Sequence, residues 1–208
     1  MWYAIFKKIK KMFPGLISII RPLYRCINPK GLCFTAQVSP EDYFVKPNFD
    51  KEQFFFSKST AEYLTHKLSD FNYVCCLCTP RLACEIEKSG KKVRLLDIDD
   101  RFSFIRGYQP YDISRGEKLN EDFDAVFVDA PFSLSEIELL HGIECVCNGC
   151  KGGVTLCVVF PAVREASLLR TFAPYKLKRV VIEELKWNNI RAEYSDQYGL
   201  YASKDIFT

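Results

Sequence analysis

The stretch Ala125-Val126-Phe127-Val128-Asp129-Ala130-Pro131-Phe132 decides the fold class of this 208-residue chain. Its first four residues form an apolar run that predicts a buried strand, and the Ser-Leu-Ser-Glu at 133–136 predicts the start of a helix. A carboxylate, a proline and an aromatic ring therefore stand at the carboxyl end of a strand, where open α/β sheets bind ligands. The alternative is an ordinary turn, because Asp and Pro are common turn residues.

Strand and helix patterns alternate on both sides of this stretch. Short apolar runs predict the strands, and apolar residues at helical spacing predict the helices between them. The expected strands are residues 73–78, 93–99, 108–113, 124–128, 153–160, 177–184 and 198–202, and the expected helices are 57–70, 81–88, 135–147 and 164–171. Strands separated by helices of this length predict an α/β fold with a mostly parallel, doubly wound sheet.

The net charge of +3 conceals a basic N-terminal arm. Residues 1–40 carry seven lysines and arginines and no acid, so the remaining residues sum to −4. We therefore expect an arm with an irregular lead-in over residues 1–50 and one domain over 51–208. The arm is either an amphipathic membrane-surface helix, a targeting segment, a phosphate-neutralising segment, or a terminal helix packed on the domain. The longest uncharged stretch of residues 1–25, Met12–Ile20, falls far short of the ~20 residues that span a bilayer, so no transmembrane segment is expected.

The ten cysteines favour an intracellular protein over a disulfide framework. Cysteines 75, 76 and 78 lie in one apolar run, where thiols behave as small core residues. No cleavable signal pattern precedes them, so we expect reduced thiols and a cytoplasmic location, with a nuclear or nucleolar one as the alternative. The one candidate ligand cluster, Cys145-x-Cys147-x-x-Cys150, lacks a clear fourth ligand, and no metal site is predicted.

Polar residues follow several of the expected strands. Thr79-Pro80-Arg81 follows the first strand, Asp97 and Asp99 end the second, and Asp129 ends the fourth. Parallel strands bring these ends to one edge, where an acidic residue after the second strand accepts hydrogen bonds from ribose hydroxyls. Asp97 suits that role, and Asp112, near the end of the third strand, is a further cofactor-binding candidate. Solvation and capping are the alternative explanation of these carboxylates.

The loop after the first strand argues against a cofactor that carries phosphates. It contains no Gly-x-Gly, so its backbone offers no cradle for a pyrophosphate. S-adenosylmethionine has no phosphate and remains compatible. Its sulfonium methyl would meet an acceptor amine held by the Asp129 carboxylate and a backbone carbonyl beside Pro131. Phe132 would provide a face on which a base stacks.

Five segments carry a resemblance to a known family. They are Gln53–Ser57, Thr79–Leu82, Leu95–Phe102, Asp129–Phe132 and Phe160-Pro161. In this order and spacing, the chain from about Gln53 onward resembles N6-adenine methyltransferase-like proteins, which carry an Asp-Pro-Pro-Phe/Tyr motif. Most segments are closer to the rRNA adenine-N6 methyltransferase branch with CCHC-type zinc fingers. Residues 189–194 are similar, less closely, to the branch that methylates a lysine of translation elongation factor 1A.

The resemblance implies a Rossmann-like class I methyltransferase domain that uses S-adenosylmethionine. It implies that Asp129, Pro131 and Phe132 are catalytic and face the acceptor nitrogen. The residues that it places near the cofactor are Gln53, Phe54, Phe56, Thr79, Pro80, Arg81, Asp97 and Asp99. The chain departs from the family at Ala130, which replaces the first proline of the motif, and in lacking the zinc-finger arrays. That proline contributes stiffness rather than a functional group, so we expect activity to survive.

Three functions follow from these observations. The first is methylation of adenine N6 in RNA, with ribosomal RNA as the substrate and the basic arm as a source of phosphate contacts. The second is lysine methylation of elongation factor 1A, because an aromatic ring and a carboxylate can hold an amine. The third is a methyltransferase-fold binding protein without activity. Binding of S-adenosylmethionine that is lost in Asp97→Ala would argue against the third.

Overall fold

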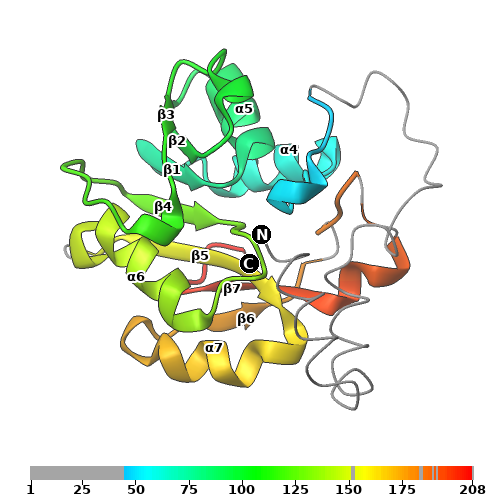
Figure 1. Ribbon diagram of the computed structural model, residues 1–208, viewed down its shortest axis with the longest axis vertical. Helices are drawn as coiled ribbons and strands as arrows, with labels where there is room; N and C mark the ends of the chain where they lie inside the picture. Colours follow the sequence, from blue (N-terminus) through cyan, green and yellow to red (C-terminus); the bar gives the residue numbers. More distant parts are fainter. Residues whose placement is uncertain (1–44, 151–152, 183–184, 189, 191, 208) are drawn as a thin grey trace, which may run out of the picture. The chain divides into compact units, whose positions relative to one another are not determined.

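The structure is a computed structural model that describes residues 45–150, 153–182, 185–188, 190 and 192–207 (Figure 1). The basic arm at residues 1–40 lies outside these residues. Its role and the expected domain boundary at residue 50 therefore stay predictions. Among the described residues, no helix is long and apolar enough to cross a bilayer.

Seven strands form one sheet in the order β3-β2-β1-β4-β5-β7-β6. Strands β1 to β5 are mutually parallel, and β7 runs antiparallel between β5 and β6. This order, with the antiparallel β7 inserted before β6, is that of the Rossmann-like fold of class I S-adenosylmethionine-dependent methyltransferases. The predicted fold class is confirmed. The strands are β1 Tyr73–Leu77, β2 Lys92–Asp97, β3 Tyr108–Pro110, β4 Ala125–Val128, β5 Thr155–Pro161, β6 Lys178–Val180 and β7 Tyr198–Ala202.

In the part of the chain that the structure describes, four α-helices cover the two faces of the sheet (Figure 1). They are α4 Lys58–Lys67, α5 Pro80–Lys88, α6 Glu136–Val146 and α7 Glu165–Thr171. Successive residues of each central strand alternate between the faces. In β4, Ala125 and Phe127 pack with α4 and α5, whereas Val126 and Val128 pack with α6 and α7. Because both faces are covered, β1 and β4 are buried almost throughout, which explains why they read as continuous apolar runs.

Three of the helices begin at residues whose type favours a helix start. Ser57 Oγ accepts a hydrogen bond from Thr60 N at 3.1 Å and begins α4. Ser135 begins α6 with a reciprocal pair of bonds to Glu138, a capping box. Pro80 occupies the first turn of α5, where a missing N–H has no consequence.

Three predicted strands end at least two residues before their expected carboxyl ends. β2 ends at Asp97 because Asp99 N–H turns back to Asp97 Oδ1 at 2.9 Å, and Asp99 then caps the 3₁₀ turn η4 Asp100–Phe102. β3 ends at Pro110, since Asp112 caps the 3₁₀ turn η5 Ile113–Arg115. β6 covers residues 178–180 of the expected 177–184.

Among the described residues, one cysteine differs from the expectation of reduced thiols. Cysteines 75, 76, 78, 84, 145 and 157 are free thiols, and most of them are buried. Cys147 is disulfide-bonded, so the expectation of free thiols is wrong there. Within the described part of the chain, no group of three or more His, Cys, Asp or Glu side chains could hold a metal ion.

Candidate active site

An open cavity lies at the carboxyl ends of β1, β2 and β4. It is therefore at the edge of the sheet where the sequence places the polar strand ends. The side chains around it come from four segments that are separated in sequence. They are Lys51, Glu52, Gln53, Phe54, Phe55, Cys78, Pro80, Asp97, Ile98, Asp129, Ala130, Pro131 and Phe132.

Asp97 supplies the carboxylate on the β2 side of the cavity. The side chain is buried, and this desolvation raises the pKa of Asp97 to about 6. The backbone N–H of Asp99 donates to Asp97 Oδ1 and opposes part of that rise. Ile98 follows with 57% of its surface exposed and also borders the cavity. A buried carboxylate beside an exposed aliphatic side chain suits a ribose joined to a planar base.

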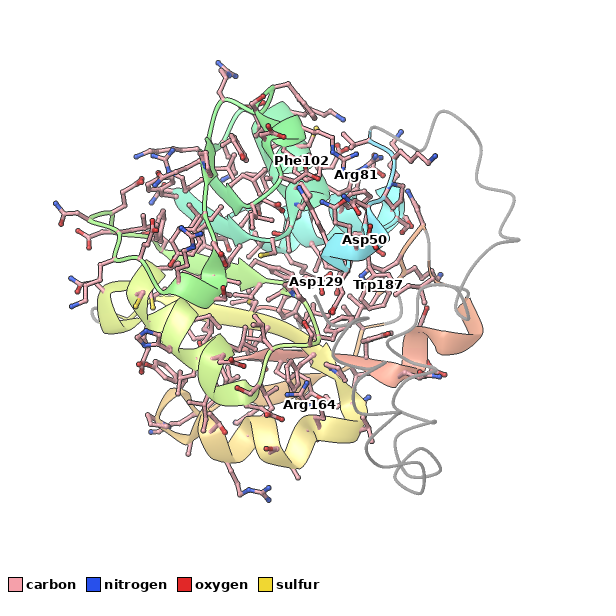
Figure 2. The ribbon with its side chains drawn as sticks, in the orientation of Figure 1. Asp50, Arg81, Phe102, Asp129, Arg164 and Trp187 are labelled. Carbon is pink, nitrogen blue, oxygen red and sulfur yellow. The ribbon has the colours of Figure 1, made fainter. Side chains whose placement is uncertain are left out.

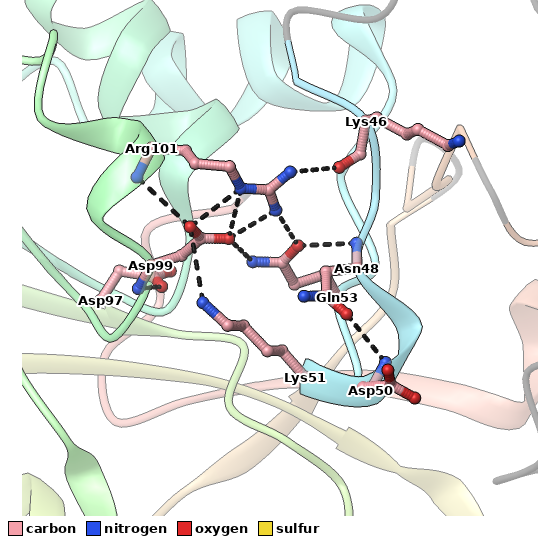
Figure 3. A network of polar contacts seen from close by, with 8 residues as sticks. All are labelled: Lys46, Asn48, Asp50, Lys51, Gln53, Asp97, Asp99 and Arg101. Carbon is pink, nitrogen blue, oxygen red and sulfur yellow. Dashed lines mark hydrogen bonds and ion pairs between the residues drawn. The ribbon is translucent and has the colours of Figure 1, made fainter.

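Asp99 is turned away from the cavity into a polar network (Figure 3). Its carboxylate accepts hydrogen bonds from Gln53 Nε2 at 2.6 Å and from the guanidinium of Arg101, and Lys51 Nζ lies 3.5 Å away. The Arg101 hydrogen bonds hold the pKa of Asp99 well below its usual range. Gln53 Oε1 in turn accepts from Asn48 N at 2.8 Å. Asp99 thus ties residues 48–53 to the end of β2.

Asp129 supplies the carboxylate on the β4 side. Its backbone N–H donates to Leu77 O at 3.2 Å. This bond continues the pairing of β1 with β4 and fixes the position of the Asp129 backbone. Asp129 Oδ2 accepts a hydrogen bond of 3.1 Å from Trp187 Nε1, and Figure 2 shows the two residues near each other. Burial raises the pKa of Asp129 to about 7, against the opposing effect of the indole hydrogen bond.

Phe132 lies within a group of aromatic rings. Its ring stacks with Tyr198 at 4.7 Å and with Phe54 at 6.0 Å between centroids, and 6% of its surface is exposed. Trp187 packs against Tyr198 at 5.2 Å. A base could therefore reach the face of Phe132 only after one ring of the group moves. Phe54 is the half-buried member that also borders the cavity.

Seven of the expected site residues border the cavity, and the other five do not. The seven are Gln53, Phe54, Pro80, Asp97, Asp129, Pro131 and Phe132. Among the other five, Asp99 forms the network above, and Phe56 packs edge-on against Phe127 in the core. Thr79 is buried at the start of α5, where Arg81 Nε lies 3.5 Å from Glu85. Asp112 caps η5 and pairs with Arg115.

Several residues at the cavity had no signal in the sequence. Cys78 adopts a φ of +59° at the end of β1, a conformation that favours glycine, and its thiol side chain borders the cavity. Glu52 has a φ of +51°, and its Oε2 accepts from Ser133 N at 3.1 Å. Trp187 reaches Asp129 across 58 positions of sequence. Contacts of this kind depend on tertiary structure and leave no local pattern.

The cavity residues fit S-adenosylmethionine. Three carboxylates, those of Glu52, Asp97 and Asp129, surround the cavity together with one lysine, Lys51. This balance favours a ligand that carries a sulfonium and an ammonium group. Buried Asp97 can accept the hydroxyls of a ribose, and the loop after β1 has no glycines for phosphates.

Solved structures with a similar fold include three methyltransferases. A TehB-like S-adenosylmethionine-dependent methyltransferase from Corynebacterium glutamicum is 13% identical, with 70% of this chain and 88% of that chain covered and a TM-score of 0.48. A candidate RNA methyltransferase from Pyrococcus horikoshii is 15% identical, with 76% and 88% covered and a TM-score of 0.47. The ribosomal protein L11 methylase from Lactobacillus delbrueckii subsp. bulgaricus is 11% identical, with 78% and 91% covered and a TM-score of 0.46.

No curated protein matches the chain. A family model does match it, and that model is described as "Probable N6-adenine methyltransferase". The match runs over residues 47–195. It includes all of the segments around the cavity and more than half of the chain. The chain therefore belongs to the probable N6-adenine methyltransferase family, whose members use S-adenosyl-L-methionine.

Proposed function

We propose that this protein methylates the N6 amino group of an adenine in RNA, and that the RNA is ribosomal. One observation carries the proposal: Asp129-Ala130-Pro131-Phe132, at the end of β4, borders the same cavity as Asp97, at the end of β2. A carboxylate for the acceptor amine and a carboxylate for the ribose of the methyl donor thus share one cavity. The two strands are joined through β1, which lies between them.

On the β2 side, we assign cofactor binding to Asp97 and to the residues beside it. S-adenosylmethionine, when bound, supplies an electrophilic methyl group on a positively charged sulfur. Asp97 holds the ribose hydroxyls, and Ile98 packs against the adenine ring. Gln53 and Lys51 reach the same strand end through Asp99. Phe56, Thr79, Arg81 and Asp112 support the surrounding backbone from behind, so we assign them an indirect role.

On the β4 side, we assign the acceptor amine to Asp129 and a backbone carbonyl. The Pro131 carbonyl already accepts the Leu134 N–H at 3.2 Å, so the Ala130 carbonyl is the better second acceptor. With both N–H groups accepted, Asp129 and the Ala130 carbonyl would leave the nitrogen lone pair free for the methyl group that S-adenosylmethionine would supply. The nitrogen would lose one proton on methylation. A carboxylate with a pKa of about 7 can take up that proton near neutral pH.

Ribosomal RNA is the proposed substrate because most of the matching segments are closer to the rRNA branch of the family. The test compares nucleosides from purified ribosomal RNA of cells with and without the protein, by mass spectrometry. We expect less N6-methyladenine in the cells that lack it, and its restoration by the wild-type protein but not by Asp129→Asn. Unchanged N6-methyladenine in every RNA fraction would remove this proposal.

A second candidate, lysine methylation of elongation factor 1A, is favoured by the charge of the cavity. Three carboxylates against one lysine would attract a cationic lysine side chain. Asp129 would then have to accept a proton before transfer, because only a neutral amine is nucleophilic. Intact-mass measurement of elongation factor 1A from the same two cell lines decides between the candidates. A loss of one or more methyl masses would favour the lysine.

A further inference from the structure

Arg164 contacts the loop that follows the Asp129–Phe132 motif. It ends the 3₁₀ turn η7 Ala162–Arg164, directly after β5. Its Nη1 donates to the Phe132 carbonyl at 2.9 Å, and its Nη2 donates to the Leu134 carbonyl at 2.9 Å. Nε donates to Glu136 Oε1 at 3.0 Å. Figure 2 labels Arg164 beside α6 and α7.

The environment of Arg164 makes these hydrogen bonds stronger than surface contacts. The guanidinium lies over the ring of Phe160, 4.5 Å from its centroid. The side chains of Arg164 and Glu136 are 25% and 13% exposed, so water screens the pair only partly. Burial acts to raise the pKa of Glu136, but the hydrogen bond and charge of Arg164, together with hydrogen bonds from the Glu136 backbone and from Ser167, lower this pKa on balance. Glu136 therefore orients the guanidinium.

The contacts fall on two carbonyls of the loop whose start forms the acceptor side of the cavity. Phe132 follows Pro131, and Leu134 donates its own N–H back to the Pro131 carbonyl. The N-terminal end of the same loop contains Ala130, whose φ is not fixed by a ring as that of a proline would be. The loop thus has less internal stiffness before Pro131 than two consecutive prolines would give it, and an external guanidinium clamp after it.

We propose that Arg164 is a positioning residue: it fixes the loop from Pro131 to Leu134 so that Asp129 and the Ala130 carbonyl hold the acceptor amine. This role rests on the proposed function of the loop as the acceptor side. The planar guanidinium donates in three directions at once, which the single ammonium of a lysine cannot do in the same geometry. Arg164 itself touches neither the cofactor nor the acceptor.

The first arm of the test measures loop order and does not require a substrate. Amide hydrogen exchange of the segment 130–135 is followed by mass spectrometry in wild type, Arg164→Gln and Arg164→Lys. Arg179→Gln is the matched control, because Arg179 Nη1 bonds a carboxylate, Glu165, at 2.9 Å but touches no carbonyl of this loop. We expect faster exchange of this segment in both Arg164 variants and wild-type exchange in the control.

The second arm measures methyl transfer to ribosomal RNA from cells that lack the protein. Small displacements of reacting groups cost about 100-fold in rate, so we expect kcat of Arg164→Gln to fall by roughly 10- to 100-fold. The KM for RNA and the affinity for S-adenosylhomocysteine should change less than about two-fold. Ala130→Pro in the Arg164→Gln background should restore part of kcat, because the ring stiffens the loop from its other end.

The outcomes separate this proposal from the proposed function. If wild type transfers no methyl group to RNA, the proposed function fails while the exchange arm still tests the clamp. If the amides of the segment 130–135 exchange at the wild-type rate in a folded Arg164→Gln protein, the proposed role of Arg164 is wrong. An equal loss of S-adenosylhomocysteine affinity and kcat would also overturn it, because the effect would then be general unfolding. Arg164→Lys, which keeps the charge, serves if the glutamine variant does not fold.

Discussion

The indole Nε1 of Trp187 donates a hydrogen bond of 3.1 Å to Oδ2 of Asp129. Trp187 is buried, and it is held in turn by Phe56, with which it forms an antiparallel β-bridge and a ring contact at 5.7 Å. The segment after β6 thereby reaches back to the residue that follows β4. Trp187 orients one oxygen of Asp129, and in the proposed function the other oxygen accepts the amine.

Trp187→Phe should shift the pH dependence of methyl transfer upward. The amine needs the ionised form of Asp129, so the rate should fall as pH decreases through about 7, the pKa to which burial raises this carboxyl. The indole hydrogen bond favours the ionised form, and its loss raises the pKa further. A hydrogen bond to a charged group corresponds to roughly one pKa unit, so the acidic limb of kcat/KM should move up by about 1 pH unit.

The control for this measurement is Asp129→Asn, which has no carboxyl to titrate. We expect its residual activity to be low and to show no acidic limb near pH 7. An acidic limb in Asp129→Asn at the wild-type position would assign the titration to another group. An unshifted limb in a folded Trp187→Phe protein would show that the indole does not tune Asp129.

Asp97→Asn should weaken cofactor binding without unfolding the protein. The carboxylate can accept two hydroxyls of a ribose, whereas the amide can accept at one atom only. Losing charge-assisted hydrogen bonds of about 1.5–3 kcal/mol should raise the Kd for S-adenosylhomocysteine roughly 10- to 100-fold, as measured by calorimetry. The pKa of about 6 predicts that wild-type binding weakens below that pH as Asp97 gains a proton.

Asp100→Asn is the matched control for Asp97, since Asp100 lies three residues away and is exposed. Its Kd should stay within about two-fold of wild type, in line with the small effect of surface substitutions. If the two variants bound S-adenosylhomocysteine equally well, Asp97 would not be the ribose-binding residue.

Asp99→Asn should destabilise the domain, and more so at neutral than at acid pH. The Arg101 guanidinium and Gln53 hold the pKa of Asp99 below its usual value of about 3.9. A lowered folded pKa means that the stabilisation is present above about pH 4 and is lost as pH falls below it. We expect urea unfolding at pH 7 to show a loss of about 1.5–3 kcal/mol, and a smaller difference from wild type at pH 3. A constant difference at both pH values would mean that the charge of Asp99 does not matter.

Local patterns were enough to predict the sheet and its helices. Ser57 and Ser135 cap α4 and α6 at the first residues of the expected helices 57–70 and 135–147, and the apolar run 125–128 is a central strand. Asp97 and Asp129 reach one cavity because the carboxyl ends of parallel strands share an edge. The expectation that Asp99 borders the cavity fails, because the orientation of a side chain cannot be predicted from the sequence pattern. Asp99 turns into a network with Arg101, although it lies only two positions after Asp97.

The supports of the site could not be predicted from any window of sequence. Trp187 and Arg164 reach the β4 loop from segments that follow β6 and β5. Neither stands in a motif, and each acts through hydrogen bonds that exist only in the folded chain. Glu52 likewise meets Ser133 across 81 positions. The two carboxylates of the site can thus be predicted from the sequence, but the residues that hold the site in place cannot.

Glu52→Gln tests the class of acceptor through charge alone. The glutamine oxygen can still accept the Ser133 N–H, so the contact between residue 52 and the β4 loop is kept while one negative charge at the cavity disappears. A unit charge acts on a phosphate about 10 Å away by roughly 0.4 kcal/mol in water, which corresponds to about two-fold in binding. With an RNA substrate we expect the KM to fall by about two-fold at low salt and to approach wild type at high salt.

Glu62→Gln is the control for this prediction, because Glu62 is an exposed acid on α4 that does not border the cavity. Its KM for RNA should match wild type at each salt concentration. A lysine substrate reverses the sign, since the lost carboxylate would then have attracted the substrate cation. A higher KM for RNA in Glu52→Gln would contradict the repulsion on which the prediction rests. A higher KM for elongation factor 1A, with measurable transfer to it, would move the assignment from the base to the lysine.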